Sequence, residues 1–328
     1  MDYSIDKNDF SSREEGFSRR NFLAMASAAF ATAITLPEST LQAAPSPGAY
    51  KGKLCFFSKP LPDMDWRRLA QSVKRLGFDG VDLTVRKGGH VKPERAAEDL
   101  PKAVSVIREE GLDVPMITTA LISADDPTAR PILSTAAKLG IPFFKAGYYY
   151  YEFKDVRKEL EKAGNEFRRL AELAKQCGIQ AGYHNHSEYV GAAVWDIANF
   201  IEPLDPKWAG YYFDSCHAVA EGGAGAWKTA THLVASRLKM VAVKDVLWDK
   251  TPEGWRIRTC PLGEGMADWR YFLGVLAQYG FQGPISLHIE YFEAGGRTPA
   301  EKENDVLAAA QRDLDFLKAH LREAYGQT

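Results

Sequence analysis

Cysteine is scarce in this 328-residue chain, and its four copies lie far apart, at Cys55, Cys177, Cys216 and Cys260. No two of them form a C-x-x-C pair, which argues against a zinc ribbon or a thioredoxin-like redox motif. An oxidising compartment would permit a disulfide, but this wide spacing defines no disulfide framework. We therefore expect buried free thiols.

A strong excess of charge of either sign is also missing. The chain has 41 Lys and Arg residues against 43 Asp and Glu residues, a formal net charge of -2 and a pI of about 6.4. Surfaces that bind nucleic acid are usually strongly basic, so this balance argues against a nucleic-acid partner. Otherwise the composition, 45% hydrophobic and 26% charged, is that of an ordinary globular protein.

The glycine-rich fingerprints of nucleotide-binding folds are absent as well. No G-x-G-x-x-G follows the first expected strand, and no G-x-x-x-x-G-K-[ST] occurs anywhere. The sequence also has no short repeat, no low-complexity tract and no stretch that reads as an interdomain linker. These absences favour a single domain without a phosphate-binding loop.

Only one long apolar run is present, FLAMASAAFATAITL at 22–36, and it is short for a membrane span, which needs roughly 20 residues. Arg19 and Arg20 precede it, and Gln42-Ala43-Ala44 follows it. A basic segment, an apolar segment and a small-residue exit are typical of a secretory signal, and the paired arginines resemble the twin-arginine type. We therefore expect 1–44 to be a signal peptide and leader, the mature protein to begin near Ala44 or Pro45, and export to the periplasm or another extracytoplasmic space. The alternative is a buried N-terminal helix.

After residue 50, short apolar runs alternate with segments of helical periodicity. Strands are expected at 54–58, 80–85, 114–119, 142–147, 179–186, within 208–217, at 239–246 and at 284–291. Helices are expected at 65–78, 93–112, 126–140, 155–178, 195–204, 227–238, 268–280 and 300–321. Eight β-then-α units predict an α/β fold, a (β/α)8 TIM barrel that forms a single domain over 50–325. A doubly wound open sheet is the alternative.

Polar residues collect at the ends of the expected strands, where a barrel of this kind carries its active site. Five of the seven histidines lie there, and so do several acids and lysines: His90, His184, His186, His217 and His288, with Asp82, Lys145, Asp214, Lys244, Asp245 and Glu290. Polar groups buried at a strand end need partners, so one shared polar site explains them together.

Alternation along a strand makes His184 and His186 point the same way, and likewise His288 and Glu290. Convergence of these strands with the one that carries Asp214 predicts a metal site made of His184, Asp214 and His288. Two imidazoles and a carboxylate suit a first-row divalent ion such as Mn, Co, Fe or Zn. For each histidine taken singly, the alternative is a hydrogen-bonded structural residue.

The remaining polar residues divide into acid–base candidates and substrate-binding candidates. The catalytic candidates are His186, Glu188, His217, Lys244 and Glu290. Histidine titrates near neutral pH, Glu188 could instead orient His186, and Lys244 could stabilise an oxyanion or simply pair with Asp82 or Asp245. The substrate-binding candidates are Asp82, Arg86, His90, Lys145 and Tyr149. The VRKGGH segment is either an active-site loop or a solvated turn. The tyrosines at 148–151 either form a platform that stacks on the sugar or pack under neighbouring loops.

The order GYHNH, FDSCH, VKD, PLGEG and GPISLHIEY resembles the xylose isomerase-like TIM-barrel family of sugar phosphate isomerases and epimerases, over nearly all of 50–325. The resemblance implies a metal held by Glu, Asp, His and Glu at four strand ends. Asp214 matches the family pattern. His184 and His288 stand where the family has glutamates, and Ala242 stands where it has a histidine.

The resemblance implies an isomerase or epimerase that acts on a keto-sugar or related polyol by metal-assisted proton abstraction next to a carbonyl, and the signal segment adds the expectation of export. A keto-sugar lyase or dehydratase on the same site is one alternative. Another is a sugar-binding barrel that has lost the metal, in which the histidines, Lys145 and Lys244 contact substrate hydroxyls or a carboxylate. A metal-dependent endonuclease, as in another branch of the superfamily, is disfavoured by the slightly negative net charge of the chain and by the expected export from the cytoplasm. We expect a small sugar as partner and no membrane span in the mature protein, and the oligomeric state, a homo-oligomer included, stays open.

Overall fold

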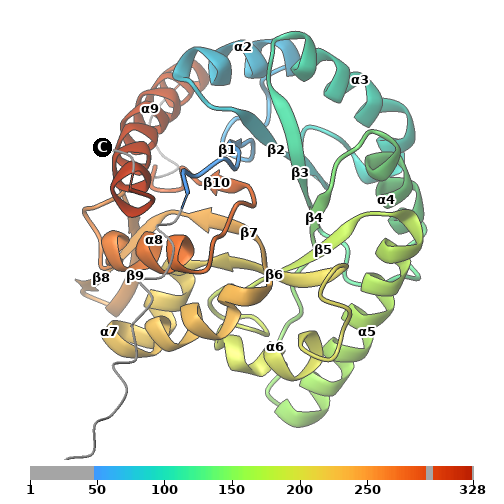
Figure 1. The fold of residues 1–328 in the computed structure, drawn as a ribbon, viewed down its shortest axis with the longest axis vertical. Coiled ribbons are helices and arrows are strands. Elements are labelled where there is room, and N and C mark those ends of the chain that lie inside the picture. The colour runs from blue at the N-terminus through green and yellow to red at the C-terminus, as the bar shows by residue number, and fades with distance from the viewer. Residues whose placement is uncertain (1–47, 293–297, 327–328) are drawn as a thin grey trace, which may run out of the picture. The chain divides into compact units, whose positions relative to one another are not determined.

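The computed structural model describes residues 48–292 and 298–326, so the expected signal segment 1–44 lies outside the described residues. Eight parallel strands close into a barrel in the order β1-β10-β7-β6-β5-β4-β3-β2 (Figure 1). They are β1 (Leu54–Phe57), β2 (Gly80–Val85), β3 (Asp113–Thr119), β4 (Phe143–Lys145), β5 (Gln180–His184), β6 (Ala209–Asp214), β7 (Leu238–Val243) and β10 (Ile285–Leu287). The prediction of a single (β/α)8 TIM barrel is confirmed.

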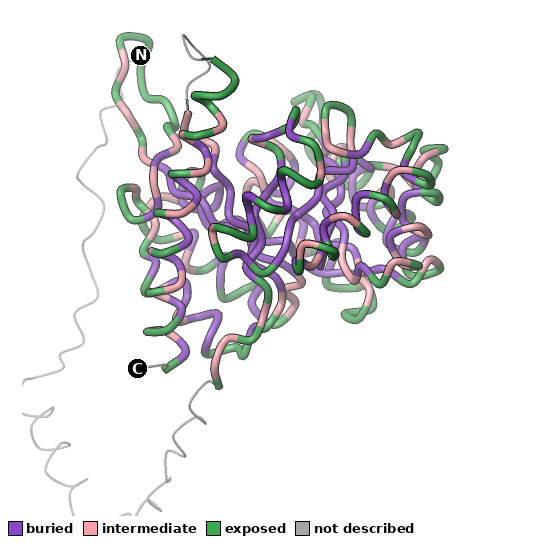
Figure 2. The backbone as a smooth tube through the Cα atoms, turned by 90° about the horizontal axis from the view of Figure 1, so that it is seen from above, coloured by how far each residue is buried: buried purple, intermediate pink, exposed green. Residues whose placement is uncertain are grey.

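Helices follow the strands and form the outer ring of the barrel (Figure 1). They are α2 (Trp66–Leu76), α3 (Ala96–Glu109), α4 (Ala129–Lys138), α5 (Val156–Cys177), α6 (Val194–Ile201), α7 (Ser215–Val234), α8 (Trp269–Gln278) and α9 (Pro299–Ala324). Figure 2 shows that the buried parts of the chain run mainly through the centre, whereas exposed stretches lie toward the periphery.

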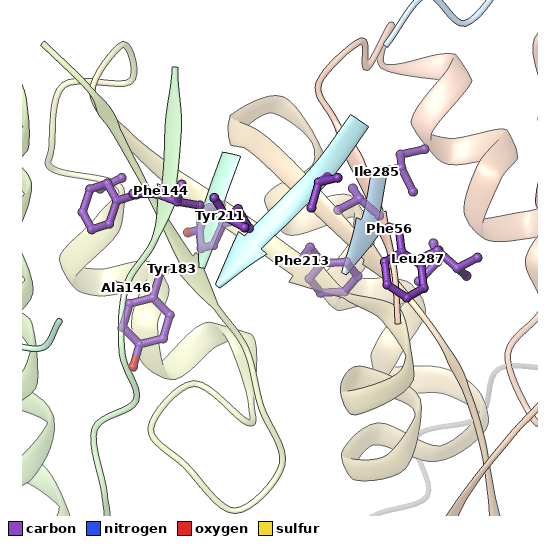
Figure 3. Packing of buried hydrophobic residues seen from close by; sticks show 14 of the residues in the cluster. Phe56, Phe144, Ala146, Tyr183, Tyr211, Phe213, Ile285 and Leu287 are labelled. Carbon is purple, nitrogen blue, oxygen red and sulfur yellow. The ribbon is translucent and has the colours of Figure 1, made fainter. Parts of the chain in front are cut away.

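Side-chain alternation divides each strand between two environments. On β6, Tyr211 and Phe213 belong to the large apolar cluster between strands and helices, together with Phe56 and Leu287 (Figure 3). Tyr212, between the two, instead packs with residues of the barrel interior. The same period of two therefore aims the intervening polar side chains at the inside of the barrel.

A small apolar plug fills the interior of the barrel. It consists of Met116, Tyr212, Met240 and Ala242, with Phe143 packed against it. Gly182 lies next to this plug, and a Cβ built on it would force the Met240 methyl group to move. With the interior closed in this way, the open ends of the strands are the place where polar side chains can meet a ligand.

Two features differ from the sequence-based expectation. Helix α7 begins at Ser215, directly after β6, and not at residue 227, because the Asp214 carboxylate caps it by accepting a hydrogen bond of 3.2 Å from the His217 backbone N–H. Gly223, at φ 54° and ψ -145°, interrupts this helix, so the expected segment 227–238 overlaps only its second part.

The second difference is an antiparallel hairpin of β8 (Asp245–Thr251) and β9 (Gly254–Cys260), in a stretch that was expected to be a loop. The buried Asp245 carboxylate anchors the segment that follows the hairpin. It accepts hydrogen bonds from the backbone N–H groups of Gly263 and Gly265 and from Trp269 Nε1. The sequence PLGEG thus serves to wrap the chain around one buried carboxylate.

All four cysteines fall within the described ranges and are free thiols; Cys55, Cys216 and Cys260 are buried. Over the same ranges no helix combines the length and the apolar character that crossing a bilayer requires.

Candidate active site

A cavity of about 190 Å³ opens where the strands end. Its walls come from the ends of all eight barrel strands and the loops behind them, and it is lined by Phe57, Lys59, Arg86, Thr118, Lys145, Tyr148, His184, His186, Tyr189, Tyr212, Lys244, His288 and Glu290. The volume lies below the ~300–1,000 Å³ of pockets for drug-sized ligands, and therefore suits a molecule of about monosaccharide size. A larger cavity of about 700 Å³, beside residues of α5 and the end of α6, lies away from this cluster.

His184, Asp214 and His217 place their ligand atoms within 4.8 Å of one another. Asp214 Oδ2 lies 3.2 Å from His184 Nε2 and 3.7 Å from His217 Nε2. Atoms bound about 2 Å from one ion stand roughly 3.3 Å apart at tetrahedral corners, so these spacings are close to those of a metal's ligands. His217 Nε2 is buried and has no hydrogen-bond partner among the described residues, as expected of an atom reserved for a ligand.

The other ring nitrogen of each histidine is held in place. Tyr148 Oη lies 2.9 Å from His184 Nδ1, and Ser187 Oγ lies 2.6 Å from His217 Nδ1. Such outer hydrogen bonds fix the orientation and the tautomer of a ligand histidine. Burial, and after it nearby lysine charges, lowers the pKa of both imidazoles well below the usual value, so both are neutral, the form that binds metal.

Asn185 fixes the carboxylate relative to β5. Its side-chain amide donates to the Asp214 backbone oxygen at 2.9 Å, and its side-chain oxygen accepts from the Asp214 N–H at 2.8 Å. These two bonds tie the end of β5 to the end of β6. They hold Asp214 beside His184.

Lys244 competes for the same carboxylate. Its ammonium lies 3.3 Å from Asp214 Oδ2 and 2.9 Å from Glu290 Oε2, and Lys59 also contacts Glu290. Burial alone would raise the pKa of Asp214 and of Glu290, but the Lys244 charge together with the other neighbouring cationic and hydrogen-bonding groups outweighs it and holds both pKa values below the usual range. Lys244 therefore pairs with Asp214 and Glu290, and not with Asp82 or Asp245, the two partners considered from the sequence.

A second polar chain runs through the barrel interior. Tyr212 Oη donates to Asp82 Oδ2 at 3.2 Å and lies 3.0 Å from His288 Nε2. The Tyr212 hydroxyl uses its single proton in the bond to Asp82. His288 Nε2 therefore carries a proton and donates it to Tyr212 Oη, and the lone pair of the ring lies on Nδ1. Nδ1 has no hydrogen-bond partner in the described part of the chain, and Phe57 stacks on the ring at 4.1 Å between centroids. Burial lowers the pKa of His288 well below its usual value, so the ring is neutral and its Nδ1 lone pair is available to a ligand.

His186 offers a similar free nitrogen from β5. Its Nδ1 lies 2.9 Å from the Ser187 carbonyl oxygen, which can only accept, so Nδ1 carries the proton and Nε2 the lone pair. Burial lowers the pKa of this imidazole too. The cavity therefore holds two neutral imidazole bases, on strands that are separated by β6 and β7 in the closed barrel.

The sequence profile of the xylose isomerase-like TIM barrel matches residues 70–320. The chain belongs to this family. No curated protein sequence matches it.

Solved structures of the same fold support the family assignment. A xylose isomerase-like TIM barrel protein from Mycobacterium smegmatis in complex with magnesium superposes with a TM-score of 0.65 at 17% identity, over 85% of this chain and 99% of that one. D-psicose 3-epimerase from Clostridium cellulolyticum H10, with D-tagatose, gives 0.62 at 15% identity, over 82% and 99%. The IOLI protein with a zinc atom gives 0.66 at 13% identity, over 83% and 99%. At these identities the likeness establishes the fold.

Relative to the family's expected ligand set, the cluster in this chain is displaced. Ala242 is buried in the apolar plug and offers no ligand atom. His288 bonds to Tyr212 and is not among the three residues whose ligand atoms converge, although the sequence predicted it as a ligand; His217 converges there in its place. His184 and Asp214 belong both to the predicted set and to the converging one.

Six of the candidates from the sequence lie outside the cavity lining. Asp214 and His217 belong to the converging cluster with His184, and the other four lie elsewhere. Glu188 is exposed, and Tyr149 donates to the Ile122 carbonyl at 2.7 Å. His90 bonds to Thr84 Oγ1 through Nδ1 at 3.2 Å and lines a separate surface hollow. Asp82 lies buried behind the cavity, where it accepts bonds from Tyr212 and other hydroxyls.

Several contributors were not among the candidates from the sequence: Lys59, Asn185, Ser187 and Tyr212. Tyr148 belongs to the tyrosine stretch that was considered as a sugar platform, but its contact with His184 was not predicted. Tyr212 could have been found, because it lies two residues before Asp214 and alternation sends both inward. Tyr148 and Ser187 lie in loops, where no periodicity indicates which way a side chain points.

Proposed function

We propose that this protein is an isomerase or epimerase that acts on a keto-sugar or related polyol by removing a proton from the carbon next to a carbonyl. The observation that carries the proposal is the pair of neutral imidazoles, His186 and His288, whose free nitrogens share one cavity with the Lys244 ammonium. Neutral imidazoles are effective acid–base groups near pH 7. The family assignment and the epimerases among the structural neighbours favour the same chemistry.

In the proposed reaction one imidazole takes the proton from the carbon, and the electron pair moves onto the carbonyl oxygen. Lys244, buried and fixed between two carboxylates, is positioned to stabilise the negative charge that develops there. The first imidazole, now protonated, can return this proton to the neighbouring carbon, which moves the carbonyl. Inversion would require the second imidazole to take a proton from solvent and deliver it to the opposite face, while the first releases its proton to solvent. Glu290 is engaged by the Lys244 and Lys59 ammonium groups, and in this scheme it positions Lys244.

The residues present fit a divalent metal, and we propose His184, Asp214 and His217 as its ligands. The unpartnered His217 Nε2 and the convergence of the three ligand atoms support this set. Two nitrogens and one oxygen suit Mn, Co, Fe or Zn. A bound ion would act as a Lewis acid toward the carbonyl. Lys244, only 3.3 Å from a ligand oxygen, weakens metal binding by charge repulsion.

We also propose export by the twin-arginine route, supported by Arg19-Arg20 before the apolar run at 22–36. Replacing both arginines with lysine in the full-length chain should retain the protein in the cytoplasm. Fractionation that finds the double variant exported as efficiently as the wild type would contradict this proposal.

The function is tested with purified protein and a panel of ketoses, by looking for new stereoisomers or carbonyl isomers in product mixtures. A His186→Gln/His288→Gln double variant is the control, because it keeps the bulk of both side chains and removes both bases. Products that appear with the wild type and not with the double variant support the proposal. Loss of a substituent from the sugar would indicate the lyase alternative, and binding without any turnover would indicate the sugar-binding protein.

A further inference from the structure

The charges around the cavity are unequal. Four cationic side chains line it, Lys59, Arg86, Lys145 and Lys244, against one carboxylate, Glu290. The histidines on the wall do not offset this, since they are neutral, as argued above. Such an arrangement produces a positive potential in a small, partly dry space, where charge interactions are strong.

Two of these cations are already paired. Lys59 and Lys244 both contact Glu290, and Lys244 has Asp214 as its second partner. Arg86 and Lys145 are different: across residues 48–292 and 298–326, neither side chain makes a hydrogen bond or ion pair with a carboxylate. The excess charge therefore belongs to these two residues.

Lys145 is the more informative of the two, because it is only 2% exposed. Its ammonium lies 3.3 Å from the centroid of the Tyr148 ring, a cation–π contact. Asp82, the nearest candidate counter-ion, accepts bonds from the hydroxyls of Thr118, Ser286 and Tyr212. A buried ammonium without an anion is costly, and burial, followed by the Arg86 charge, lowers the pKa of Lys145 well below its usual value.

Arg86 completes the arrangement from the neighbouring wall. It directly follows β2, whereas Lys145 ends β4, and these strands flank β3 in the barrel. The barrel order puts β3 across from β7, after which Lys244 follows. A ligand that spans the mouth would meet Lys244 at one end and the Arg86–Lys145 pair at the other.

We propose that Arg86 and Lys145 form a subsite for an anionic group of the substrate, a carboxylate or a phosphate. The inference rests on the proposed function, and it narrows the substrate class from keto-sugars in general to keto-sugar acids or keto-sugar phosphates. The planar Arg86 guanidinium suits bidentate contact with either anion, and Lys145 provides a buried point charge. The anion supplies the partner that Lys145 lacks.

The test is calorimetric binding of three ligands that differ in charge: D-fructose, D-fructose 6-phosphate and 2-keto-D-gluconate. For the wild type we expect at least one charged ligand to bind about tenfold or more tightly than D-fructose, as charge-assisted hydrogen bonds usually provide. Lys145→Met and Arg86→Gln should each reduce this preference about tenfold. Lys87→Met removes a charge from the adjacent exposed position, outside the cavity lining, and should leave the preference unchanged.

The two charged ligands distinguish the source of the anion, because tight binding of only one identifies a phosphate or a carboxylate. Equal affinities for all three ligands would overturn the inference, and so would a preference that persists in both variants. Lys145→Met replaces an unpaired buried charge with an apolar chain and should fold, and the half-buried Arg86 provides an independent second variant. Turnover of neutral ketoses with no anion preference would refute only the subsite. Anion preference without any turnover would refute only the isomerase proposal.

Discussion

Replacing Asp82 by Asn should stabilise the barrel more at neutral pH than at acid pH. Asp82 is completely buried, and burial raises its pKa from 3.8 to about 6, although hydrogen bonds from Thr118, Ser286 and Tyr212 oppose this. Because the folded-state pKa lies above the unfolded value, the neutral acid favours folding. Its contribution to stability is fully present below pH 3.8 and is lost as the pH rises toward about 6.

The size of the effect follows from these two values. For an acid with a pKa of 3.8 unfolded and about 6 folded, linkage gives a loss of about 2 kcal/mol in unfolding free energy between about pH 4.5 and about pH 7.5. Asparagine has nearly the same shape and does not titrate. The stability of Asp82→Asn relative to the wild type should therefore increase by about 2 kcal/mol over this interval.

Urea unfolding followed by circular dichroism at the two pH values measures this difference. Asp63→Asn, which alters an exposed carboxylate, is the matched control and should show a much smaller change. A relative stability of Asp82→Asn that stays constant with pH, or that falls as the pH rises, would refute the account of a carboxylate destabilised by burial.

Three further substitutions test the supporting contacts. Tyr148→Phe removes the partner of His184 Nδ1 and should weaken metal binding about 10- to 100-fold without unfolding the protein. Lys244→Met removes an ammonium 3.3 Å from Asp214, so metal should bind more tightly, while kcat should fall about 10²–10³-fold for lack of oxyanion stabilisation. Asp245→Asn weakens the bonds that hold the PLGEG segment and should cost about 2–4 kcal/mol of stability.

Metal titration, steady-state kinetics and thermal unfolding, respectively, check these three expectations. Unchanged metal affinity in the Tyr148 variant would show that the tyrosine does not orient a ligand. Weaker metal binding in the Lys244 variant would contradict the repulsion between lysine and metal. A stable Asp245 variant would mean that the segment is held by other contacts.

The sequence predicted the barrel well because its signals are local. The strand at 80–85 was placed with the same bounds that the structure shows, since alternation and flanking glycines mark it clearly. Position at the ends of the expected strands also identified residues that now line one cavity, among them Arg86, Lys145, His184 and Lys244. The family resemblance is confirmed, whereas export remains a prediction.

What the sequence did not indicate depends on local geometry at the strand ends. His217 reaches the Asp214 carboxylate because helix α7 starts at Ser215. The first turn of this helix places the His217 side chain next to Asp214, the N-cap residue three positions earlier. The expected helix began twelve residues later, so this convergence was hidden. His288 was predicted as a ligand from the direction of its strand, but its ring orientation depends on Tyr212, which comes from another strand.

The central claim is that His186 and His288 act as two proton-transferring bases in one cavity. It is tested most directly by proton NMR of a converted ketose in D₂O, with the wild type and the single variants His186→Gln and His288→Gln. Two bases predict deuterium at the carbon next to the carbonyl with the wild type. Each single variant should still exchange the carbon-bound proton of one epimer for deuterium. Neither variant should convert one epimer into the other. Full epimerisation by either variant, or no deuterium incorporation by the wild type during conversion, would contradict the claim.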